Sequence, residues 1–306
     1  MSRAVSIGRV LVGGPASLAL IAGPCVIEGH DVMRRTAEAL TAAAEELGLG
    51  LIFKSSFDKA NRSSAGSYRG PGLQEGLRQL DELKREFGFP VVSDVHETAQ
   101  IAPAAEVLDC LQIPAFLARQ TDLLAAAAES GRPVNVKKGQ FMAPEDMALA
   151  AAKMEARPGF AGLLLCERGS FFGYHNLVVD MRSLAVMAAA GWPVIFDATH
   201  SVQRPSAGDG RSDGDRRHIP TLARAAVAAG LEGLFMETHP CPERAKCDGP
   251  NQWPLDRLKP LLSQLKAFHE LAKAHRDDFA ALEPSPLLAS GVGPGAASNR
   301  PRDDDA

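Results

Sequence analysis

LALIAGP at residues 18–24 is a run of apolar residues that ends on a glycine and a proline. Seven further apolar runs follow along the chain, and helix-like segments separate them. A short apolar run bounded by turn residues is typical of a buried strand. The eight runs are LALIAGP (18–24), LIFKSSF (51–57), PVVSDVH (90–96), CLQIPA (110–115), PVNVKKG (133–139), GLLLCERG (162–169), PVIFDATH (193–200) and GLFMETHP (233–240).

The segments between these runs predict helices. DVMRRTAEALTAAAEELG (31–48) and GLQEGLRQLDELKREFG (72–88) have apolar residues at helical spacing and end on glycine, as C-capped helices do. Strands that alternate with helices form a parallel sheet, and eight is the number that a closed β/α barrel needs. We therefore predict one (β/α)8 barrel, an α/β fold, over residues 1–276. VSIGRVLVGG (5–14) is expected to form a hairpin that plugs the bottom of the barrel.

Two polar segments fall outside this pattern. Residues 277–306 are rich in Pro, Gly, Ser and Asp, and their low apolar content predicts a disordered tail. SVQRPSAGDGRSDGDRRHIP (201–220) follows the seventh run and is long, polar and rich in glycine. We expect it to be a lid over the active end that is disordered without ligand.

The composition indicates a globular enzyme. Hydrophobic residues make up 45% and charged residues 23% of the 306 residues, close to the globular average. The formal net charge of -4 argues against a nucleic-acid partner. Because the sequence has neither a secretory signal nor an apolar stretch long enough to span a membrane, we expect a cytoplasmic protein without membrane contact. The five cysteines lie in apolar runs, so we expect free thiols rather than disulfides.

Reactive side chains gather at the C-terminal ends of the predicted strands. Barrel enzymes carry their active sites at this end, so residues far apart in sequence should converge on one mouth. The strand-end residues are Lys54 and Ser56, Asp94 and His96, Gln112, Lys137 and Lys138, Glu167 and Arg168, Asp197 and His200, and Glu237 and His239, with Cys25 after the first strand.

Four residues are candidate ligands for a divalent metal. A thiolate, an imidazole and two carboxylates suit zinc, iron or manganese, whereas magnesium prefers oxygen ligands. A buried cysteine can also serve as a small apolar side chain, and the sequence alone leaves that alternative open. Cys241 and Cys247 fit no common zinc-binding spacing, so we expect both to be structural or incidental. The candidates are Cys25, His200, Glu237 and, in the loop after the eighth run, Asp248.

Six cations fall on or just beyond the predicted strand ends. They would repel one another without anionic ligands, and phosphate and carboxylate groups meet that need. The hydroxyl-rich and amide-containing stretch FKSSFDKANRSS (53–64) is typical of a site for a polyol phosphate. The cations are Lys54, Lys59, Arg62, Arg119, Lys137 and Arg168.

Eight motifs carry a resemblance to a known family. They are FKSSFDKANRSS, SYRGPGL (67–73), SDVHE (93–97), LQIPAFLARQTDL (111–123), NVKKGQF (135–141), ERGSFFGYHNLVVDM (167–181), FDATH (196–200) and HPCPERAKCDGP (239–250). From about Leu18 to Lys273 the chain resembles the 3-deoxy-D-manno-octulosonate 8-phosphate synthases, also called 2-dehydro-3-deoxyphosphooctonate aldolases. The resemblance implies condensation of phosphoenolpyruvate with D-arabinose 5-phosphate and water, a step towards bacterial lipopolysaccharide, by a homotetramer.

The resemblance also assigns roles to residues of this sequence. Phosphoenolpyruvate would be held by Lys59, Lys137, Arg119 and Arg168, with Lys54, Ser56 and Gln112 close by. The pentose and its phosphate would be held by Asn61, Arg62 and Ser63, the last two in a neighbouring subunit's site. His200 is expected to act as metal ligand and proton relay, and Asp94 as an orienting group or proton partner; Lys59 and Asp248 complete the catalytic set.

The family has one subclass with cysteine at the position of Cys25, which needs a divalent metal, and another with asparagine there, which needs none. Cys25 places this chain in the metal-dependent subclass, so activity should fall on stripping the metal. Cys247-Asp248-Gly249-Pro250 is more typical of the asparagine subclass, so the chain combines features of both.

Two alternatives stay open at this point. The relative that makes 3-deoxy-arabino-heptulosonate 7-phosphate shares the barrel and the Gly-Pro-Cys feature, although it typically has a Lys-Pro-Arg-Thr motif where this chain has DKANRSS (58–64). A non-catalytic barrel that binds sugar phosphates, with a structural metal, is the alternative from another class. Strand-end ligands at a substrate mouth argue against it, because closed structural zinc sites use clustered local ligands.

Overall fold

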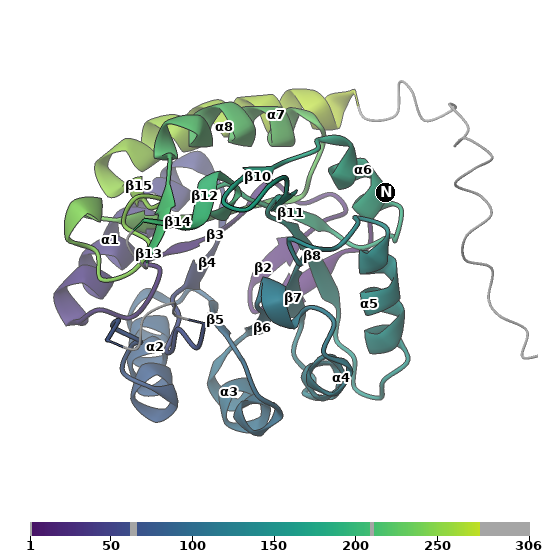
Figure 1. The fold of residues 1–306 in the computed structure, drawn as a ribbon, viewed down its shortest axis with the longest axis horizontal. Coiled ribbons are helices and arrows are strands. Elements are labelled where there is room, and N and C mark those ends of the chain that lie inside the picture. The colour runs from purple at the N-terminus through teal and green to yellow at the C-terminus, as the bar shows by residue number, and fades with distance from the viewer. Residues whose placement is uncertain (1, 62–65, 209–210, 276–306) are drawn as a thin grey trace, which may run out of the picture.

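Eight parallel strands close into a ring in the computed structural model, which describes residues 2–61, 66–208 and 211–275 (Figure 1). Each strand pairs with the next one along the chain, and the last pairs with the first, where Glu237 lies opposite Gly23. All eight predicted runs are strands, which confirms the (β/α)8 barrel. The ring strands are β3 (Ala19–Gly23), β4 (Gly50–Lys54), β5 (Val91–Asp94), β6 (Cys110–Ile113), β7 (Val134–Lys137), β8 (Leu163–Glu167), β11 (Val194–Asp197) and β14 (Gly233–His239).

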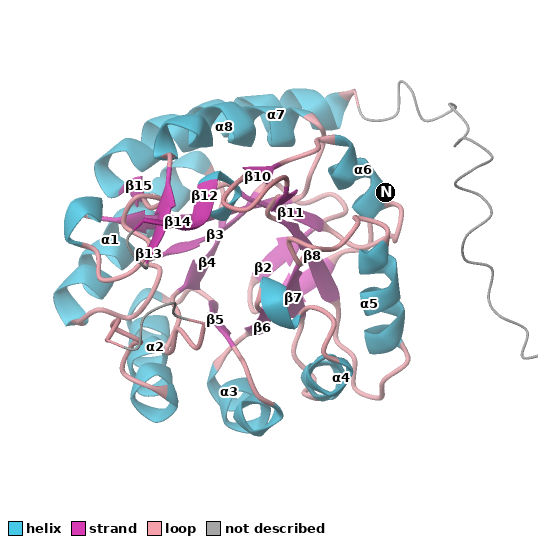
Figure 2. Cartoon of the chain, in the orientation of Figure 1, coloured by secondary structure: helices cyan, strands magenta, loops and turns pink. Residues whose placement is uncertain are grey.

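Helices surround the ring (Figure 2). Each has an apolar stripe that packs on the strands; in α1 it consists of Met33, Ala37, Leu40 and Ala44. Both long helices predicted from periodicity are present, and α1 ends on the left-handed Gly48 with φ of 64°. The helices are α1 (His30–Leu47), α2 (Leu73–Phe87), α3 (Ile101–Val107), α4 (Thr121–Glu129), α5 (Asp146–Glu155), α6 (Arg182–Ala188), α7 (Ile219–Ala228) and α8 (Leu258–Ala274).

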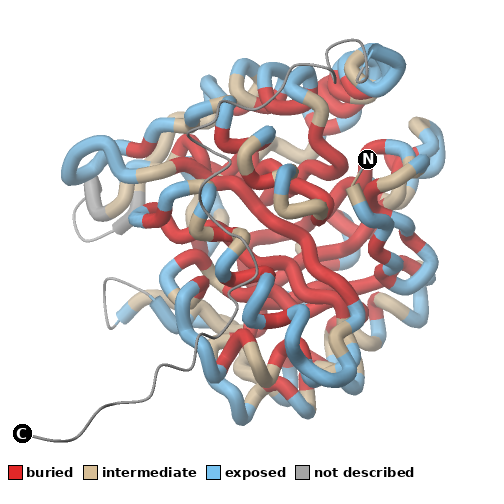
Figure 3. The backbone as a smooth tube through the Cα atoms, turned by 90° about the vertical axis from the view of Figure 1, so that its right-hand side faces the viewer, coloured by how far each residue is buried: buried red, intermediate tan, exposed pale blue. Residues whose placement is uncertain are grey.

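The core lies inside the ring and between the ring and the helices. Figure 3 shows buried strands surrounded by exposed helix faces and loops. Among the described residues, one large apolar cluster runs through both regions, and all four residues of β5, β6, β7 and β11 are buried. The packed core holds the strand ends in fixed positions, and this rigidity sets the geometry of the barrel mouth.

The predicted N-terminal hairpin consists of β1 (Val5–Ile7) and β2 (Val10–Val12). It lies against the N-terminal ends of barrel strands, because Val10 packs on Gly50 at the start of β4 and Val5 on Gly162 just before β8. A Cβ atom at Gly50 would lie 2.7 Å from Val10 Cγ1, which shows how closely the hairpin approaches. The hairpin therefore covers the end of the barrel opposite to the predicted site.

Three short strand pairings lie at the C-terminal end of the ring. β9 (Ser170–Phe171) pairs with β10 (Leu177–Val178), and β15 (Trp253–Pro254) extends β14. The segment 201–220, which we expected to be disordered, instead forms a hairpin of β12 (Gln203–Gly208) and β13 (Arg211–Gly214). The two strands of this hairpin pair with each other, so their backbone groups form hydrogen bonds without a ligand.

Two predictions concern the remainder of the chain. The predicted disordered tail, residues 277–306, lies outside the described residues. None of the helices in the described part of the chain has the length and apolar character that crossing a membrane requires.

A close backbone contact between β3 and β4 gives a test of the ring. A Cβ atom at Gly23 would lie 2.0 Å from the carbonyl oxygen of Lys54, and backbone cannot move aside as a flexible side chain can. Gly23→Ala should therefore force the two strands apart and lower the free energy of unfolding by roughly 3 kcal/mol, measured by urea denaturation. Gly66→Ala is the matched control, because a Cβ there meets open space. Equal stability of both variants would contradict this account of the β3–β4 contact.

Candidate active site

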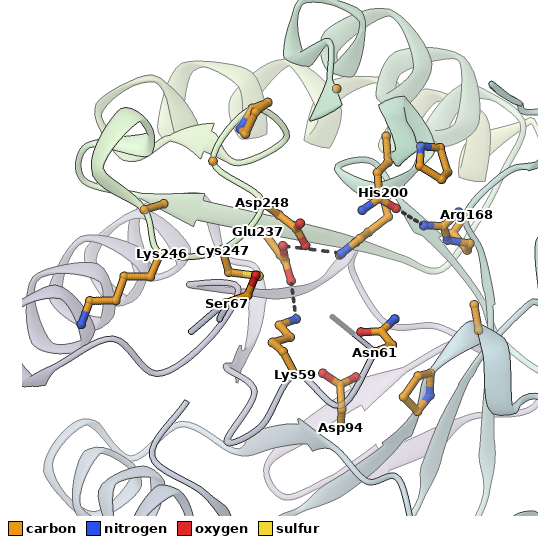
Figure 4. A pocket seen from close by; sticks show the side chains of 18 of the residues that line it. Lys59, Asn61, Ser67, Asp94, Arg168, His200, Glu237, Lys246, Cys247 and Asp248 are labelled. Carbon is orange, nitrogen blue, oxygen red and sulfur yellow. Dashed lines mark hydrogen bonds and ion pairs between the residues drawn. The ribbon is translucent and has the colours of Figure 1, made fainter. Parts of the chain in front are cut away.

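A cavity of about 1610 Å³ opens at the C-terminal ends of the strands, where the sequence predicts the site. The chemistry-bearing residues on its wall come from six different strands or the loops that follow them, so barrel closure brings them together (Figure 4). They include Lys54, Lys59, Asn61, Asp94, Lys137, Arg168, His200, Glu237, Cys247 and Asp248.

The four predicted metal ligands meet at one side of this cavity. Potential ligand atoms of His200, Glu237 and Asp248 all lie within 4.8 Å of one another. A second triad consists of Cys25, Cys247 and Asp248, again within 4.8 Å. Asp248 belongs to both triads, so the thiol and the imidazole flank the same carboxylate. The arrangement is compatible with a divalent metal.

His200 is held in an orientation that suits a metal ligand. Its Nδ1 lies 2.7 Å from Asp197 Oδ2, and a carboxylate partner places the ring proton on Nδ1. The lone pair of Nε2 then faces Glu237, whose Oε2 lies 3.6 Å away. Asp197 also accepts hydrogen bonds from the backbone N–H groups of Thr199 and His200, so the turn after β11 fixes this carboxylate.

Glu237 is fully buried, and among the described residues only one of its two carboxylate oxygens has a hydrogen-bond partner. Its Oε1 accepts a hydrogen bond of 2.8 Å from Lys54 Nζ and lies 3.7 Å from Lys59 Nζ. Its Oε2 has no hydrogen-bond partner among the described residues, although it faces His200. Burial alone would raise the pKa of Glu237, but the charges of the nearby lysines, Lys54 above all, outweigh burial and hold the pKa well below its ordinary value. Glu237 is therefore a carboxylate with a free lone pair aimed at the triad.

Asp94 is the centre of a buried polar network on the opposite wall. Its Oδ2 accepts a hydrogen bond from Ser56 Oγ, and its Oδ1 accepts one from Gln112 Nε2. Gln112 Oε1 in turn accepts a hydrogen bond of 2.8 Å from Asn135 Nδ2. Burial would raise the pKa of Asp94, but the nearby lysines, Lys54 above all, lower it well below its ordinary value. Asp94 stays ionised and fixed in place.

Lys137 faces the cavity from the end of β7. Its Nζ donates a hydrogen bond of 2.6 Å to Asp197 Oδ2 and lies 3.7 Å from the centre of the Phe235 ring. Burial would lower the pKa of Lys137, but the charge of Asp197 outweighs burial and raises it. The ammonium group is therefore retained at neutral pH, although the side chain is buried.

Arg168 presents an unused hydrogen-bond donor. The guanidinium is buried, and its Nη2 donates a hydrogen bond of 2.9 Å to Gln203 Oε1, while Nη1 has no partner among the described residues. Glu167 Oε1 accepts hydrogen bonds from the backbone N–H groups of Arg168 and Gly169 and lies 3.6 Å from the buried Lys138 Nζ. These contacts of Glu167 fix the backbone turn that carries Arg168. A buried, unpaired guanidinium N–H is costly, so the site is built for an anion.

Four further predicted residues differ in position: one is exposed, one lies at the rim of the cavity, and two lie outside the described residues. Arg119 is exposed and is not among the residues that line the cavity, although the short helical turn Ala115–Leu117 just before it does line the cavity. Asn61 lines the cavity at its exposed rim. Arg62 and Ser63 lie outside the described residues.

Sequence reasoning missed three partners of the site. Cys247, for which we expected no metal role, lies beside Cys25. Asp197 was recognised as a strand-end residue without a role, yet it orients His200 and Lys137. Gln203 was hidden in the polar segment after β11, and only the course of that segment brings it to Arg168. The position of Asp197 at a strand end was a usable signal, whereas the other two lie in loops.

Comparison with known proteins identifies the family. The sequence profile of the DAHP synthetase I family matches residues 3–274, nearly the whole described chain. The chain belongs to the DAHP synthetase I family. This agrees with the resemblance drawn from the motifs.

Several relatives of this DAHP synthetase I family member bear a more specific name, 2-dehydro-3-deoxyphosphooctonate aldolase. The protein of that name from Magnetococcus marinus is 58% identical over 271 residues, which are 89% of this chain and 94% of the relative. That from Pelobacter propionicus is 58% identical over 273 residues, covering 89% of this chain and 100% of the relative. That from Syntrophotalea carbinolica is 53% identical over 277 residues, covering 90% and 100%.

The network around Asp94 predicts a pH-dependent stability in this family member. Because folding lowers the pKa of Asp94, its contribution is complete above the ordinary value near 4 and is lost as the pH falls below it. Asp94→Asn should lower the free energy of unfolding by roughly 3 kcal/mol at pH 7, and this difference from the wild type should shrink towards pH 3. Urea denaturation at both pH values measures it.

The exposed Asp31→Asn in the first turn of α1 is the control, and it should change stability little at either pH. A stability difference for Asp94→Asn that stays constant from pH 7 to about pH 3 would contradict the ionised state assigned to Asp94.

Proposed function

We propose that the protein condenses phosphoenolpyruvate with D-arabinose 5-phosphate and water to give 3-deoxy-D-manno-octulosonate 8-phosphate and phosphate. The observation that carries the proposal is the cationic wall of buried Lys54, Lys137 and Arg168 with partly buried Lys59, which faces the His200–Glu237–Asp248 triad. The names of relatives that are 53% to 58% identical over about nine-tenths of the chain support this specific reaction.

The charges on this wall support a phosphoenolpyruvate subsite beside Arg168. Lys54 is paired with Glu237 and Lys137 with Asp197, so these two ammonium groups are already balanced. Arg168 has a free buried N–H group, and Lys59 lies 3.7 Å from Glu237, a longer and weaker pairing. We assign the phosphate of phosphoenolpyruvate to Arg168 and its carboxylate to the lysines, because a guanidinium grips phosphate bidentately.

The pentose phosphate is assigned to the rim of the cavity. Asn61 lines it there, and the resemblance adds Arg62 and Ser63, which are expected to serve the neighbouring subunit's site. Gln112 and Ser56, both buried in the Asp94 network, are proposed to position the groups that contact the reactants. Arg119 was expected at the phosphoenolpyruvate subsite, and its exposed position argues against a role within its own barrel.

The reaction forms one carbon–carbon bond, and a new carbon–oxygen bond from water replaces the carbon–oxygen bond to phosphate. The methylene carbon of phosphoenolpyruvate attacks the aldehyde carbon, and the aldehyde oxygen takes up a proton to become a hydroxyl group. Water adds to the carbon that carries the phosphate and loses a proton, after which cleavage of the carbon–oxygen bond releases inorganic phosphate. We propose His200 and Lys59 as the groups that handle these protons, because both face the same part of the cavity.

Fixed charges would stabilise the transition state of this reaction. Lys137 and Arg168 are held by Asp197 and Gln203, so they need not reorganise as phosphate departs. Asp94 is proposed to orient Lys54 and Lys59 rather than to move a proton, because its two oxygens are occupied by Ser56 and Gln112.

We also propose that Cys25, His200, Glu237 and Asp248 bind a divalent metal. The open Oε2 of buried Glu237, the Nε2 lone pair of His200 and the Asp248 carboxylate fit a cation, and the thiol of Cys25 favours zinc, iron or manganese over magnesium. When bound, such a metal supplies a Lewis acid that stabilises negative charge on an oxygen. Asp197 orients His200 for this role.

We also propose that the protein is a homotetramer in the cytoplasm. The resemblance implies the tetramer, and large aromatic side chains on the surface support association with other copies. Phe172 and Tyr174 in the β9–β10 turn are 74% and 95% exposed, and Phe141 is 53% exposed.

Substrate choice tests the proposed reaction. Phosphate release from phosphoenolpyruvate should require arabinose 5-phosphate and be at least about 100-fold faster with it than with erythrose 4-phosphate, because the site is assigned to the longer sugar. Faster release with erythrose 4-phosphate would assign the seven-carbon reaction instead, and no release with either sugar would indicate a binding protein.

Variants show whether the activity belongs to this site. Arg168→Gln should lower kcat/KM for phosphoenolpyruvate about 100-fold, as expected for loss of one fixed donor to a transferring group. Arg224→Gln on the exposed face of α7 is the matched control and should leave kcat/KM unchanged.

Metal removal tests the proposed cofactor. Dialysis against a chelator should lower kcat more than about 10-fold, and zinc, iron or manganese should restore it. Cys25→Asn should bind metal more weakly, because a thiolate ligand is lost. Full activity in protein shown by elemental analysis to contain no metal would refute the metal's role, and metal-free activity of Cys25→Asn would show that the rest of the site works without one.

A further inference from the structure

Two buried thiols lie together behind the metal-binding side of the cavity. Cys25 is in the turn after β3, and Cys247 is in the loop after β14, so 222 positions of sequence separate them. Both are free and buried. Their sulfur atoms and a carboxylate oxygen of Asp248 all lie within 4.8 Å of one another, and Cys25 Sγ is 3.4 Å from Asp248 Oδ2. Figure 4 shows Cys247 and Asp248 at the cavity wall beside Glu237.

A buried amide holds the two thiols in place. Gln252 Nε2 donates a hydrogen bond of 2.8 Å to the carbonyl oxygen of Cys247, and Gln252 Oε1 accepts one of 3.4 Å from the N–H of Cys25. Asp248 adopts a left-handed backbone with φ of 47°, which is unusual for a residue other than glycine, and its carbonyl oxygen accepts hydrogen bonds from the N–H groups of Asn251 and Gln252. The loop is thus built to present Cys247 and Asp248 together.

The pair is difficult to explain as apolar packing alone. A cysteine that only fills space is surrounded by apolar atoms, as Cys110 and Cys166 are within the main core cluster. Cys25 and Cys247 instead belong to a separate small cluster with Val26, next to a carboxylate that faces the cavity.

We infer that Cys247 is a further metal ligand, so that the metal is held by two thiolates, Cys25 and Cys247, together with Asp248. This inference rests on the metal proposed above and adds a ligand that the four-residue set lacks. On binding, each thiol releases its proton to solvent and each sulfur donates an electron pair to the cation, whose oxidation state does not change.

Two thiolates change which metal the site prefers. Sulfur ligands select soft or borderline ions, and a second sulfur strengthens that preference. The site should therefore favour zinc over manganese more strongly than a site with one thiolate, and loss of Cys247 should reduce this preference about 10-fold or more. Asp248, which belongs to both triads, connects this thiol pair to His200 and Glu237.

Cobalt(II) provides a direct count of the thiolates. Metal-free full-length protein is titrated with Co²⁺, and the near-ultraviolet sulfur-to-cobalt charge-transfer absorbance is recorded per bound ion. The wild type should show a two-thiolate intensity, and Cys247→Ser should show roughly half of it with weaker Zn²⁺ binding in competition. Binding of Zn²⁺ should also release one proton fewer in Cys247→Ser than in the wild type.

Cys241→Ser is the matched control, because Cys241 is a free, half-buried cysteine in the same loop region whose sulfur is not part of either triad. It should keep the wild-type intensity. A one-thiolate intensity in the wild type that Cys247→Ser leaves unchanged would overturn the inference while leaving the metal proposal intact. Absence of any bound Co²⁺ or Zn²⁺ would refute both the inference and the metal, whereas the condensation assay tests the reaction separately.

Discussion

The buried ion pair between Lys54 and Glu237 organises the mouth of this barrel. Its partners are 1% and 0% exposed and sit on β4 and β14, two strands that lie on either side of β3. Lys54 Nζ also donates a hydrogen bond to the carbonyl oxygen of Cys25, so one ammonium group connects three neighbouring strand ends. Removing either partner would leave the other as a buried charge with only longer pairings, which would be costly.

Charge balance around this pair divides the cavity into two regions. Lys54 and Lys137 are neutralised by Glu237 and Asp197, while Arg168 retains a donor without a partner among the described residues. The Arg168 side can thus accept an anion, and the side with His200, Glu237 and Asp248 can accept a cation. Such a division suits a reaction between two phosphorylated molecules, because charge leaves with phosphate and develops on the aldehyde oxygen.

The loop after β14 adds residues to the site that the barrel strands do not supply. Strand ends supply most of the site, and their positions follow from ring closure. Cys247 and Asp248 come instead from the loop after β14, whose course depends on Gln252 and on the left-handed backbone of Asp248. The combination of Cys25 with Cys247-Asp248 therefore gives a site richer in sulfur than either feature would provide alone.

The sequence by itself determined the eight strands, the N-terminal hairpin and the residues at the strand ends, because apolar periodicity and the period of β/α units are local properties. Tertiary structure decided the partners. Asp197 binds Lys137, Gln203 binds Arg168, and Cys247 lies beside Cys25, although the partners of each pair are far apart in the sequence. Such contacts depend on how loops cross the barrel mouth, and that path is set by long-range packing rather than by neighbouring residues.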